Sequence, residues 1–147
     1  MEHIAIMRKS WGFIPKIESG EKIIESRWYK VRYAPWGHIQ PGEKIYFKNS
    51  GEPVTLAAEV EKVLYFSDLT PEKVLEILQN YGKDDGIEQE RIPEFFERFK
   101  HKRYGILIYL KNVQRVVPFE INKQGFGAMA SWMCVDDVSK PGTGRKL

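Results

Sequence analysis

Three residues near the N-terminus have the types and spacing to form a polar binding or catalytic site. The stretch Gly20-Glu21-Lys22-Ile23-Ile24-Glu25-Ser26-Arg27 opens a predicted strand, residues 22–29, directly after a predicted helix. Side chains alternate along a strand, so Glu25 and Arg27 share one face about 7 Å apart. Lys22, at the junction of loop and strand, can lean over the same face. The three side chains then converge at one spot, which suits binding to phosphate, a base edge or an amide.

The same spacing also has a purely structural interpretation. Glu25 and Arg27 can form an ion pair on a wet barrel wall, without any ligand. If the chain is an enzyme, Lys22 and Glu25 are the candidate catalytic residues. An acid and a base on either side of a phosphate would serve a ribonuclease.

Aromatic and basic residues interleave in the segment that follows, Arg27-Trp28-Tyr29-Lys30-Val31-Arg32-Tyr33-Ala34-Pro35-Trp36. Stacking of an unpaired base on an aromatic ring contributes about 1 to 3 kcal/mol, and the cations neutralise the adjoining backbone. Tyr29 and Trp36 are therefore candidate ligand-binding residues. Trp28 shares a face with Ile24 and is expected in the core. The alternative for Trp36 is that it only packs the loop down.

A glycine-containing segment near the C-terminus offers a third candidate. Residues 122–131 carry two glycines, which let the backbone approach a ligand closely, and Trp132 follows them as a possible base-stacking residue. The segment is no dinucleotide fingerprint, because only about 20 residues remain and no βαβ unit can follow. An ordinary loop is the alternative.

Strands and helices alternate irregularly along the chain, which indicates an α+β fold. Helices are expected over residues 10–19, ending at Gly20, over 71–80, capped by Thr70, and over 93–99. The other expected strands are 4–7, 44–48, 54–66, 104–117 and 132–135. Strands with short helices inserted between them favour a small mixed β-barrel.

The motif at residues 20–27 matches G-x-K-x-x-E-x-R at every fixed position and resembles the signature of the ASCH family. The flanking helix, the turn at 40–44 and the helix after 68–70 are also similar to that family, so the resemblance covers residues 4–117. It implies a PUA-like mixed β-barrel with inserted short helices and a cleft around the motif. The family is assigned to RNA binding, and some members are hydrolases.

Two functions follow from the resemblance. In an RNA or modified-nucleotide binding module, Lys22 and Arg27 would contact phosphate or a base edge, and Glu25 would accept from a base amino group. The alternative is an amidohydrolase acting on N4-acylated cytidine-type nucleosides. In those members a threonine nucleophile stands where this chain has Glu25. Ser26 is adjacent, but strand alternation is expected to point it to the opposite face.

Length and composition limit the classes of protein. The 147 residues suit one domain, which we expect over 1–140, with a flexible tail over 141–147. No apolar run is long enough to span a bilayer, and the single Cys134 permits no intramolecular disulfide, so a cytoplasmic protein without a membrane segment is expected. The net charge is +3, with basic ends and an acidic middle, which favours a polyanion such as RNA as partner.

Metal and cofactor binding are not expected. His3, His38 and His101 are widely separated, and their spacing matches no metal site. The acidic residues of segment 84–90 do not match a calcium loop, so that segment is expected to be a solvated connector.

Overall fold

The computed structural model describes residues 1–123 and 130–138, which form one mixed six-stranded sheet and three α-helices. The strands are β1 (Glu2–Met7), β2 (Ile24–Tyr29), β3 (Lys44–Asn49), β4 (Val54–Phe66), β5 (Tyr104–Phe119) and β6 (Trp132–Val135). The helices are α1 (Phe13–Ser19), α2 (Pro71–Tyr81) and α3 (Ile92–Phe99), with 3-10 turns at Lys9–Trp11 and Gln89–Arg91. Each predicted strand and helix is present, with some ends shifted. The helix expected over 10–19 begins only at Phe13, because Gly12 ends the preceding 3-10 turn with a left-handed φ of 69°, and the strand expected over 22–29 begins at Ile24. The expected tail at 141–147 lies outside the described residues.

Local sequence signals account for the helix boundaries. The Thr70 hydroxyl accepts a hydrogen bond from the Lys73 backbone N–H at 3.2 Å, and Pro71 occupies the first turn of α2. Gly20 ends α1 with a φ of 84°, a left-handed conformation that glycine adopts without strain. This cap turns the chain directly into the motif and β2.

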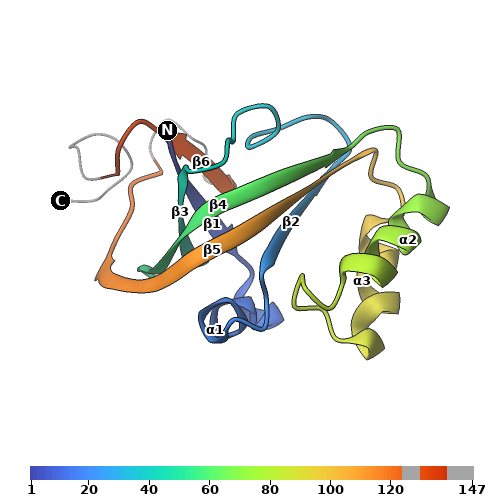
Figure 1. Ribbon diagram of the computed structural model, residues 1–147, viewed down its shortest axis with the longest axis horizontal. Helices are drawn as coiled ribbons and strands as arrows, with labels where there is room; N and C mark the ends of the chain where they lie inside the picture. The colour runs from blue at the N-terminus through green and yellow to red at the C-terminus, as the bar shows by residue number, and fades with distance from the viewer. Residues whose placement is uncertain (124–129, 139–147) are drawn as a thin grey trace.

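The sheet curves into an open half-barrel with β2 and β6 at its edges (Figure 1). The strand order is β2-β5-β4-β3-β1-β6, and β1 and β3 are parallel while the other neighbours are antiparallel. The two long strands, β4 and β5, run side by side along the length of the sheet, and bulges shift their mutual register. They therefore connect the part of the sheet that holds β2 with the part that holds β1, β3 and β6.

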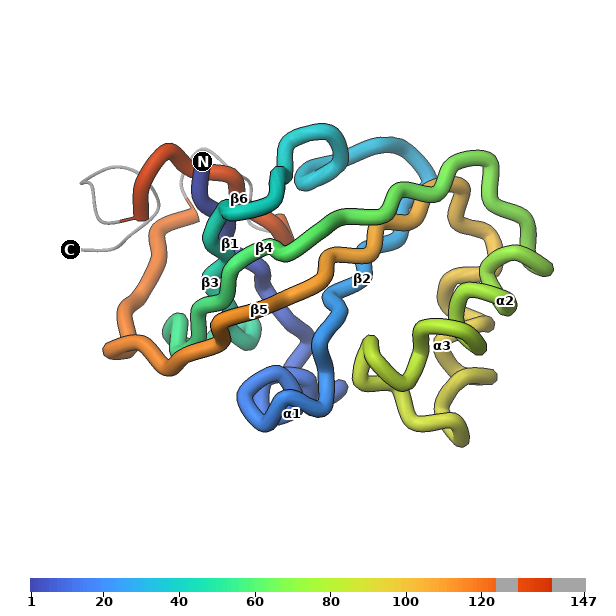
Figure 2. The backbone as a smooth tube through the Cα atoms, viewed as in Figure 1, coloured from blue at the N-terminus to red at the C-terminus, as the bar shows by residue number. Residues whose placement is uncertain are grey.

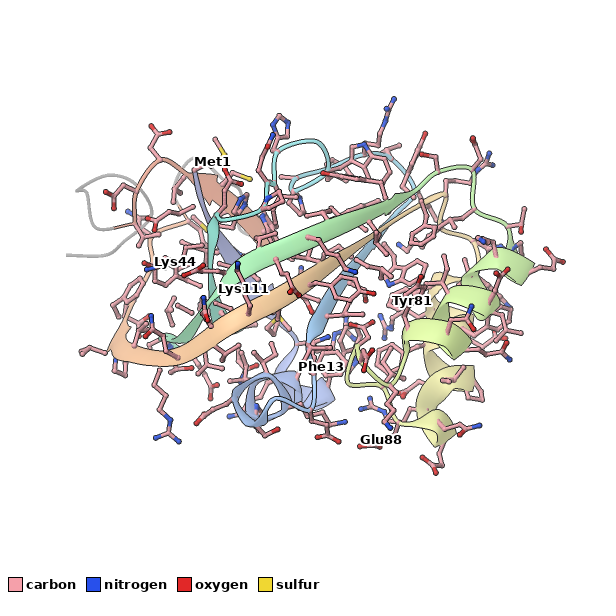
Figure 3. The ribbon with its side chains drawn as sticks, viewed as in Figure 1. Met1, Phe13, Lys44, Tyr81, Glu88 and Lys111 are labelled. Atoms are coloured by element: carbon pink, nitrogen blue, oxygen red, sulfur yellow. The ribbon has the colours of Figure 1, made fainter. Side chains whose placement is uncertain are left out.

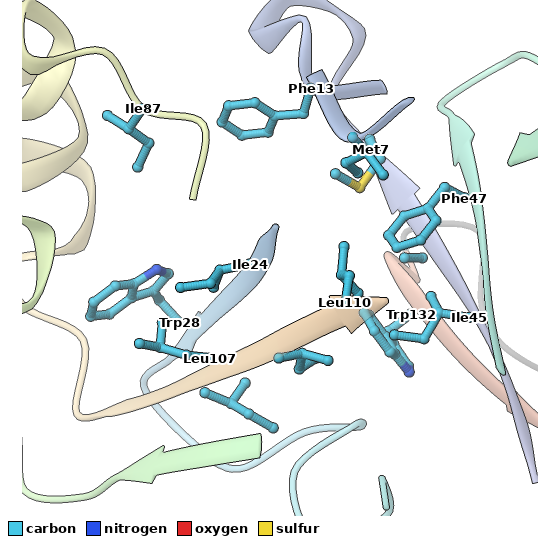
Figure 4. Close-up of a cluster of buried hydrophobic side chains, with 14 of the residues drawn as sticks. Met7, Phe13, Ile24, Trp28, Ile45, Phe47, Ile87, Leu107, Leu110 and Trp132 are labelled. Carbon is cyan, nitrogen blue, oxygen red and sulfur yellow. The ribbon is translucent and has the colours of Figure 1, made fainter. Parts of the chain in front are cut away.

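The main core lies between the sheet and the helices (Figure 4). Trp28 is 8% exposed and stacks on Phe99 of α3 with ring centroids 5.0 Å apart, so its expected core position is confirmed. Gly105 makes room for it, because a Cβ atom there would lie 3.2 Å from the Trp28 ring. A smaller apolar cluster around Ile4 and Met133 packs on another part of the sheet.

The connector between α2 and α3 returns to the start of β2. Figure 2 shows this segment passing beside β2 and α1. The backbone N–H groups of Ile23 and Ile24 both donate to the Asp84 carbonyl, at 2.8 and 2.9 Å. Residues 82–90 are thereby fixed against the motif. Within the described residues, no helix is long and apolar enough to cross a membrane.

Candidate functional site

The structure brings Lys22, Glu25 and Arg27 together, as their spacing predicts. Glu25 Oε1 lies 3.2 Å from Lys22 Nζ, and Glu25 Oε2 lies 2.8 Å from Arg27 Nη2. Their side chains are only 0% (Lys22), 4% (Glu25) and 13% (Arg27) exposed. The Glu25–Arg27 ion pair of the structural interpretation is therefore present, but it is largely buried and not on a solvent-exposed barrel wall.

Lys22 is the most deeply buried member of this cluster. Its ammonium group donates to the Asp85 carbonyl and to Asp85 Oδ1, both at 2.6 Å, and faces Glu25 Oε1. The Phe13 ring lies 4.4 Å from Nζ, and Figure 3 shows Phe13 beside the start of β2. Each of the three N–H bonds of Lys22 thus has an acceptor within the described part of the chain.

Asp85 is a site residue that the sequence did not reveal. The expectation of a solvated connector is wrong at this position, because Asp85 is 3% exposed. Gly86, at a φ of +79°, lies against Lys22, and a Cβ atom at Gly86 would lie 3.0 Å from Lys22 Cβ. The one available signal was the Asp85-Gly86 pair, which is typical of a tight turn.

The second correction concerns Ser26. Its hydroxyl donates to Asp85 Oδ2 at 2.5 Å and accepts from Trp28 Nε1 at 3.1 Å. Strand alternation holds, since Ser26 and Trp28 share a face, but it does not take Ser26 away from the site. Because β2 is an edge strand, the connector reaches around it and links Ser26 to Lys22 through Asp85.

Burial and charge act in opposite directions on Asp85. Burial raises the pKa of this carboxyl group above its ordinary value, and the negative charge of Glu25 raises it further. Lys22 and Ser26 lower the pKa through their contacts but do not cancel the effect of burial. Asp85 therefore holds a proton more readily than an exposed aspartate does.

Arg27 spans the gap between the edge strand β2 and the opposite side of the half-barrel. Its Nη1 donates to the Ser131 carbonyl at 3.1 Å, and its Nη2 approaches the Ile6 carbonyl at 3.4 Å. The strand order places β2 and β6 at opposite edges of the sheet. A side chain, anchored by Glu25, thus links the two ends of the half-barrel.

A cavity of about 490 Å³ lies beside this link. Figure 4 shows Met7, Phe13, Trp28 and Ile87, which belong to its wall. The aromatic part of the wall consists of Trp11, Phe13, Trp28, Tyr29, Phe95 and Phe99. The polar part near β2 consists of Glu25, Ser26, Arg27 and Asp85, and the remaining polar residues are Arg8, Ser50, Lys123 and Ser131. The cavity volume is in the range of small-molecule sites.

No protein-family model and no curated protein sequence matches the chain. Its fold, however, matches the crystal structure of an ASCH protein from Zymomonas mobilis, with a TM-score of 0.61 at 18% identity over 90% of this chain and 85% of that one. Two mutants of the same protein match with TM-scores of 0.61 and 0.60, at 18% and 16% identity, over 90% of this chain and 88% and 86% of theirs. The chain has the fold of an ASCH domain.

Within this ASCH fold the three aromatic candidates occupy different places. Tyr29 lines the cavity, and its hydroxyl donates to the Ala34 carbonyl at 3.0 Å. Trp36 lies elsewhere, packed edge-on against Tyr65 and Tyr104 at ring-centroid distances of 4.8 and 5.3 Å. The loop-packing interpretation therefore describes the position of Trp36.

Trp132 lies behind Arg27 on β6. It is 6% exposed, and the Arg27 guanidinium lies 5.1 Å from its ring centroid. Its indole N–H donates to His3 Nδ1 at 3.0 Å, and His3 Nε2 in turn contacts Glu43 at 2.9 Å. In this arrangement Trp132 supports Arg27. The glycines expected to shape a loop before it, Gly125 and Gly127, lie outside the described residues.

The described residues contain no group of three or more His, Cys, Asp or Glu side chains that could hold a metal ion. The polar groups of the cavity are instead a set of hydrogen-bonding side chains on an aromatic wall. Such a site can orient a flat ligand that carries hydrogen-bond donors.

Proposed function

We propose that this chain is an RNA or modified-nucleotide binding module whose cavity takes one nucleobase. The observation that carries the proposal is the pairing of an aromatic wall with the Glu25, Ser26, Arg27 and Asp85 cluster in one cavity of about 490 Å³. Flat apolar walls suit the faces of a base, and the polar cluster suits its edge. The ASCH fold supports the proposal, because the family is assigned to RNA binding.

The polar end of the cavity favours a base edge that donates hydrogen bonds. Lys22 has an acceptor for each of its three N–H bonds, and Arg27 is engaged by Glu25 and two backbone carbonyls. The carboxylate oxygens of Glu25 and Asp85, by contrast, keep lone pairs that can accept further bonds. An exocyclic amino group, as in cytosine, adenine or guanine, is the partner that this end of the cavity selects.

A titration with mononucleotides tests the proposal. We expect cytidine, adenosine and guanosine monophosphates to shift the NMR signals of cavity residues saturably, and uridine monophosphate to bind more weakly. Tyr29→Ala should weaken binding about tenfold, since base–aromatic stacking contributes about 1 to 3 kcal/mol. Tyr109→Ala is the matched control, because Tyr109 is half-buried on β5 and does not line the cavity.

The outcomes separate clearly. Saturable shifts that Tyr29→Ala weakens and Tyr109→Ala preserves would support the cavity as the binding site. If no mononucleotide shifts the cavity signals at millimolar concentration, the proposal is wrong.

A second candidate, an amidohydrolase, gains support from one contact. The hydroxyl of Ser26 points at the Asp85 carboxylate, and both residues line the cavity. A hydroxyl beside a carboxylate whose pKa is raised can pass its proton to that carboxylate as its oxygen attacks an acyl carbon. The acyl C–N bond then breaks, and the same proton goes to the leaving amine. Ser26 would then replace the threonine that stands at the position of Glu25 in the hydrolytic members. No comparable contact favours a ribonuclease that uses Lys22, because its N–H bonds are occupied.

A further inference from the structure

We propose that the base in the cavity belongs to a single-stranded RNA, and that the neighbouring nucleotide lies on an exposed surface formed by Lys30, Arg32, Tyr33 and Arg103. We call this the rim surface. The inference rests on the proposed function and specifies its ligand as a strand, not a free nucleoside.

The cluster of Lys22, Glu25, Arg27 and Asp85 supplies little net charge for a phosphate, and the other cations of the cavity wall are Arg8 and Lys123. Lys22 is held between Asp85 and Glu25, and Arg27 is held by Glu25, so these two cations face two carboxyl groups. A phosphodiester backbone needs cations that are not already neutralised. For a strand with one base in this cavity, such cations must lie outside the cluster.

A chain of aromatic contacts leads from the cavity to the rim surface. Tyr29 lines the cavity, and its ring meets the Tyr33 ring edge-on with centroids 6.3 Å apart. Tyr33 is 65% exposed, and its neighbour Val31 is 54% exposed. The distance between the two tyrosine rings is comparable to the spacing of adjacent nucleotides in an extended strand, and an exposed ring offers a stacking face for an unpaired base.

Exposed cations lie close to Tyr33 in the chain and at the end of β2. Lys30, Arg32 and Arg103 are exposed, and among the described residues none of them has a carboxylate within salt-bridge distance. The backbone N–H of Arg103 donates to the Tyr29 carbonyl at 2.9 Å, which places Arg103 beside the cavity wall. The Arg32 guanidinium lies 5.5 Å from the Tyr104 ring centroid.

The two chain segments that contain the residues of the rim surface carry no acidic residue. Residues 26–42 and 99–119 contain neither Asp nor Glu, although the chain as a whole has 20 of them. The Arg103 carbonyl accepts a hydrogen bond from the backbone N–H of Leu69, the sequence neighbour of Asp68, at 3.0 Å. The rim surface therefore attracts polyanions, and its aromatic ring distinguishes it from a merely solvated basic face.

The experiment compares a mononucleotide with a short single-stranded RNA. Binding of cytidine monophosphate and of mixed-sequence RNA nonamers is measured by calorimetry or anisotropy at several salt concentrations. We expect the RNA to bind at least tenfold more tightly than the mononucleotide. The double variant Arg32→Gln/Arg103→Gln should remove most of this gain and make the slope of log K against log salt shallower by about 1.4, for two phosphate contacts on a single strand.

Two further variants separate stacking from charge. Tyr33→Ala should weaken RNA binding about tenfold, while Tyr33→Phe should keep it, because only the ring is needed. Lys62→Gln/Lys111→Gln removes two exposed cations from β4 and β5 and should leave RNA binding nearly unchanged. Figure 3 labels Lys111 on this part of the sheet.

Each result bears on the inference. If the RNA binds no more tightly than the mononucleotide, or if both double variants weaken it equally, the rim surface is rejected while the cavity proposal stands. If RNA binds through the rim surface but no mononucleotide enters the cavity, the proposed function fails, and this inference fails with it.

Discussion

Asp85 lies 59 residues beyond Ser26 in the chain, yet its carboxylate accepts the Ser26 hydroxyl hydrogen bond at 2.5 Å. The same carboxylate binds Lys22 at 2.6 Å through its other oxygen. One buried side chain on the α2–α3 connector thus fixes the position of two motif residues. The site depends on this connector as much as on β2.

Removing the Asp85 carboxylate should destabilise the protein strongly. Asp85→Ala leaves the buried Lys22 ammonium without its nearest counter-charge, and breaking a buried pair costs about 3 to 5 kcal/mol. We expect urea unfolding to show a loss of at least about 3 kcal/mol. Asp84→Ala is the matched control, because that side chain is exposed and should change stability by less than about 0.5 kcal/mol. Equal, small losses in both variants would contradict the role given to Asp85.

A methyl group at Gly86 should disturb Lys22 directly. Gly86 and Gly51 have similar φ angles, +79° and +80°, so alanine at either position strains the backbone by about 1 kcal/mol. Only at Gly86 would the new Cβ atom also approach Lys22, at 3.0 Å, whereas nothing lies within 4 Å at Gly51. The loss of unfolding free energy for Gly86→Ala should exceed that for Gly51→Ala by at least about 1 kcal/mol. Equal losses of unfolding free energy would mean that the α2–α3 connector can move away from Lys22 without cost, which would contradict its close packing against the motif.

Acid should weaken the fold through His3. Burial lowers the pKa of His3 below its ordinary value of 6.5, although the contact with Glu43 acts in the opposite direction. The unfolded chain therefore takes up this proton as the pH falls through about 6.5, before the folded protein does, and folding stability decreases. In the neutral ring, His3 Nδ1 accepts a hydrogen bond from the Trp132 indole N–H. Protonation of Nδ1 would place two donors opposite each other and remove this hydrogen bond.

We expect the unfolding free energy to fall by about 1 kcal/mol between pH 7 and pH 5.5. The Met1 amino group, Glu2 and Glu43 also act on the pKa of His3. Because the pKa of Glu43 is itself lowered in the folded protein, protonation of Glu43 reduces folding stability only at a more acid pH than that of the His3 transition. His3→Gln should flatten the pH dependence, whereas His38→Gln and His101→Gln, at exposed positions, should not. An unchanged slope in His3→Gln would reject this assignment.

Hydrolysis of N4-acetylcytidine decides between the two proposed functions. For a binding module, we expect chromatography to show no release of cytidine, because Glu25 occupies the nucleophile position and the Ser26 hydroxyl is held by Asp85 and Trp28. Steady release that Ser26→Ala abolishes, with the fold intact by circular dichroism, would establish the hydrolase instead. Ser26→Thr is the conservative control, since threonine retains a hydroxyl group.

The sequence by itself determined the elements and the first half of the site. Hydrophobic alternation and the Thr70-Pro71 and Gly20 signals are local, so they predicted the strands, the start of α2 and the end of α1. Two-residue spacing on one strand likewise predicted that Glu25 and Arg27 meet, because the period of a strand does not depend on the rest of the fold.

Only the tertiary structure decided how deeply the site is buried and that Asp85 completes it. The acidic segment 84–90 looks solvated in sequence, because the Asp85-Gly86 pair indicates a turn but does not indicate that Asp85 is buried. Burial of one aspartate and exposure of its neighbour arise only when the connector packs against the edge strand β2. The roles of Trp36 and Trp132 were also undetermined in sequence, since an aromatic ring contributes to a core or to a surface according to its long-range neighbours.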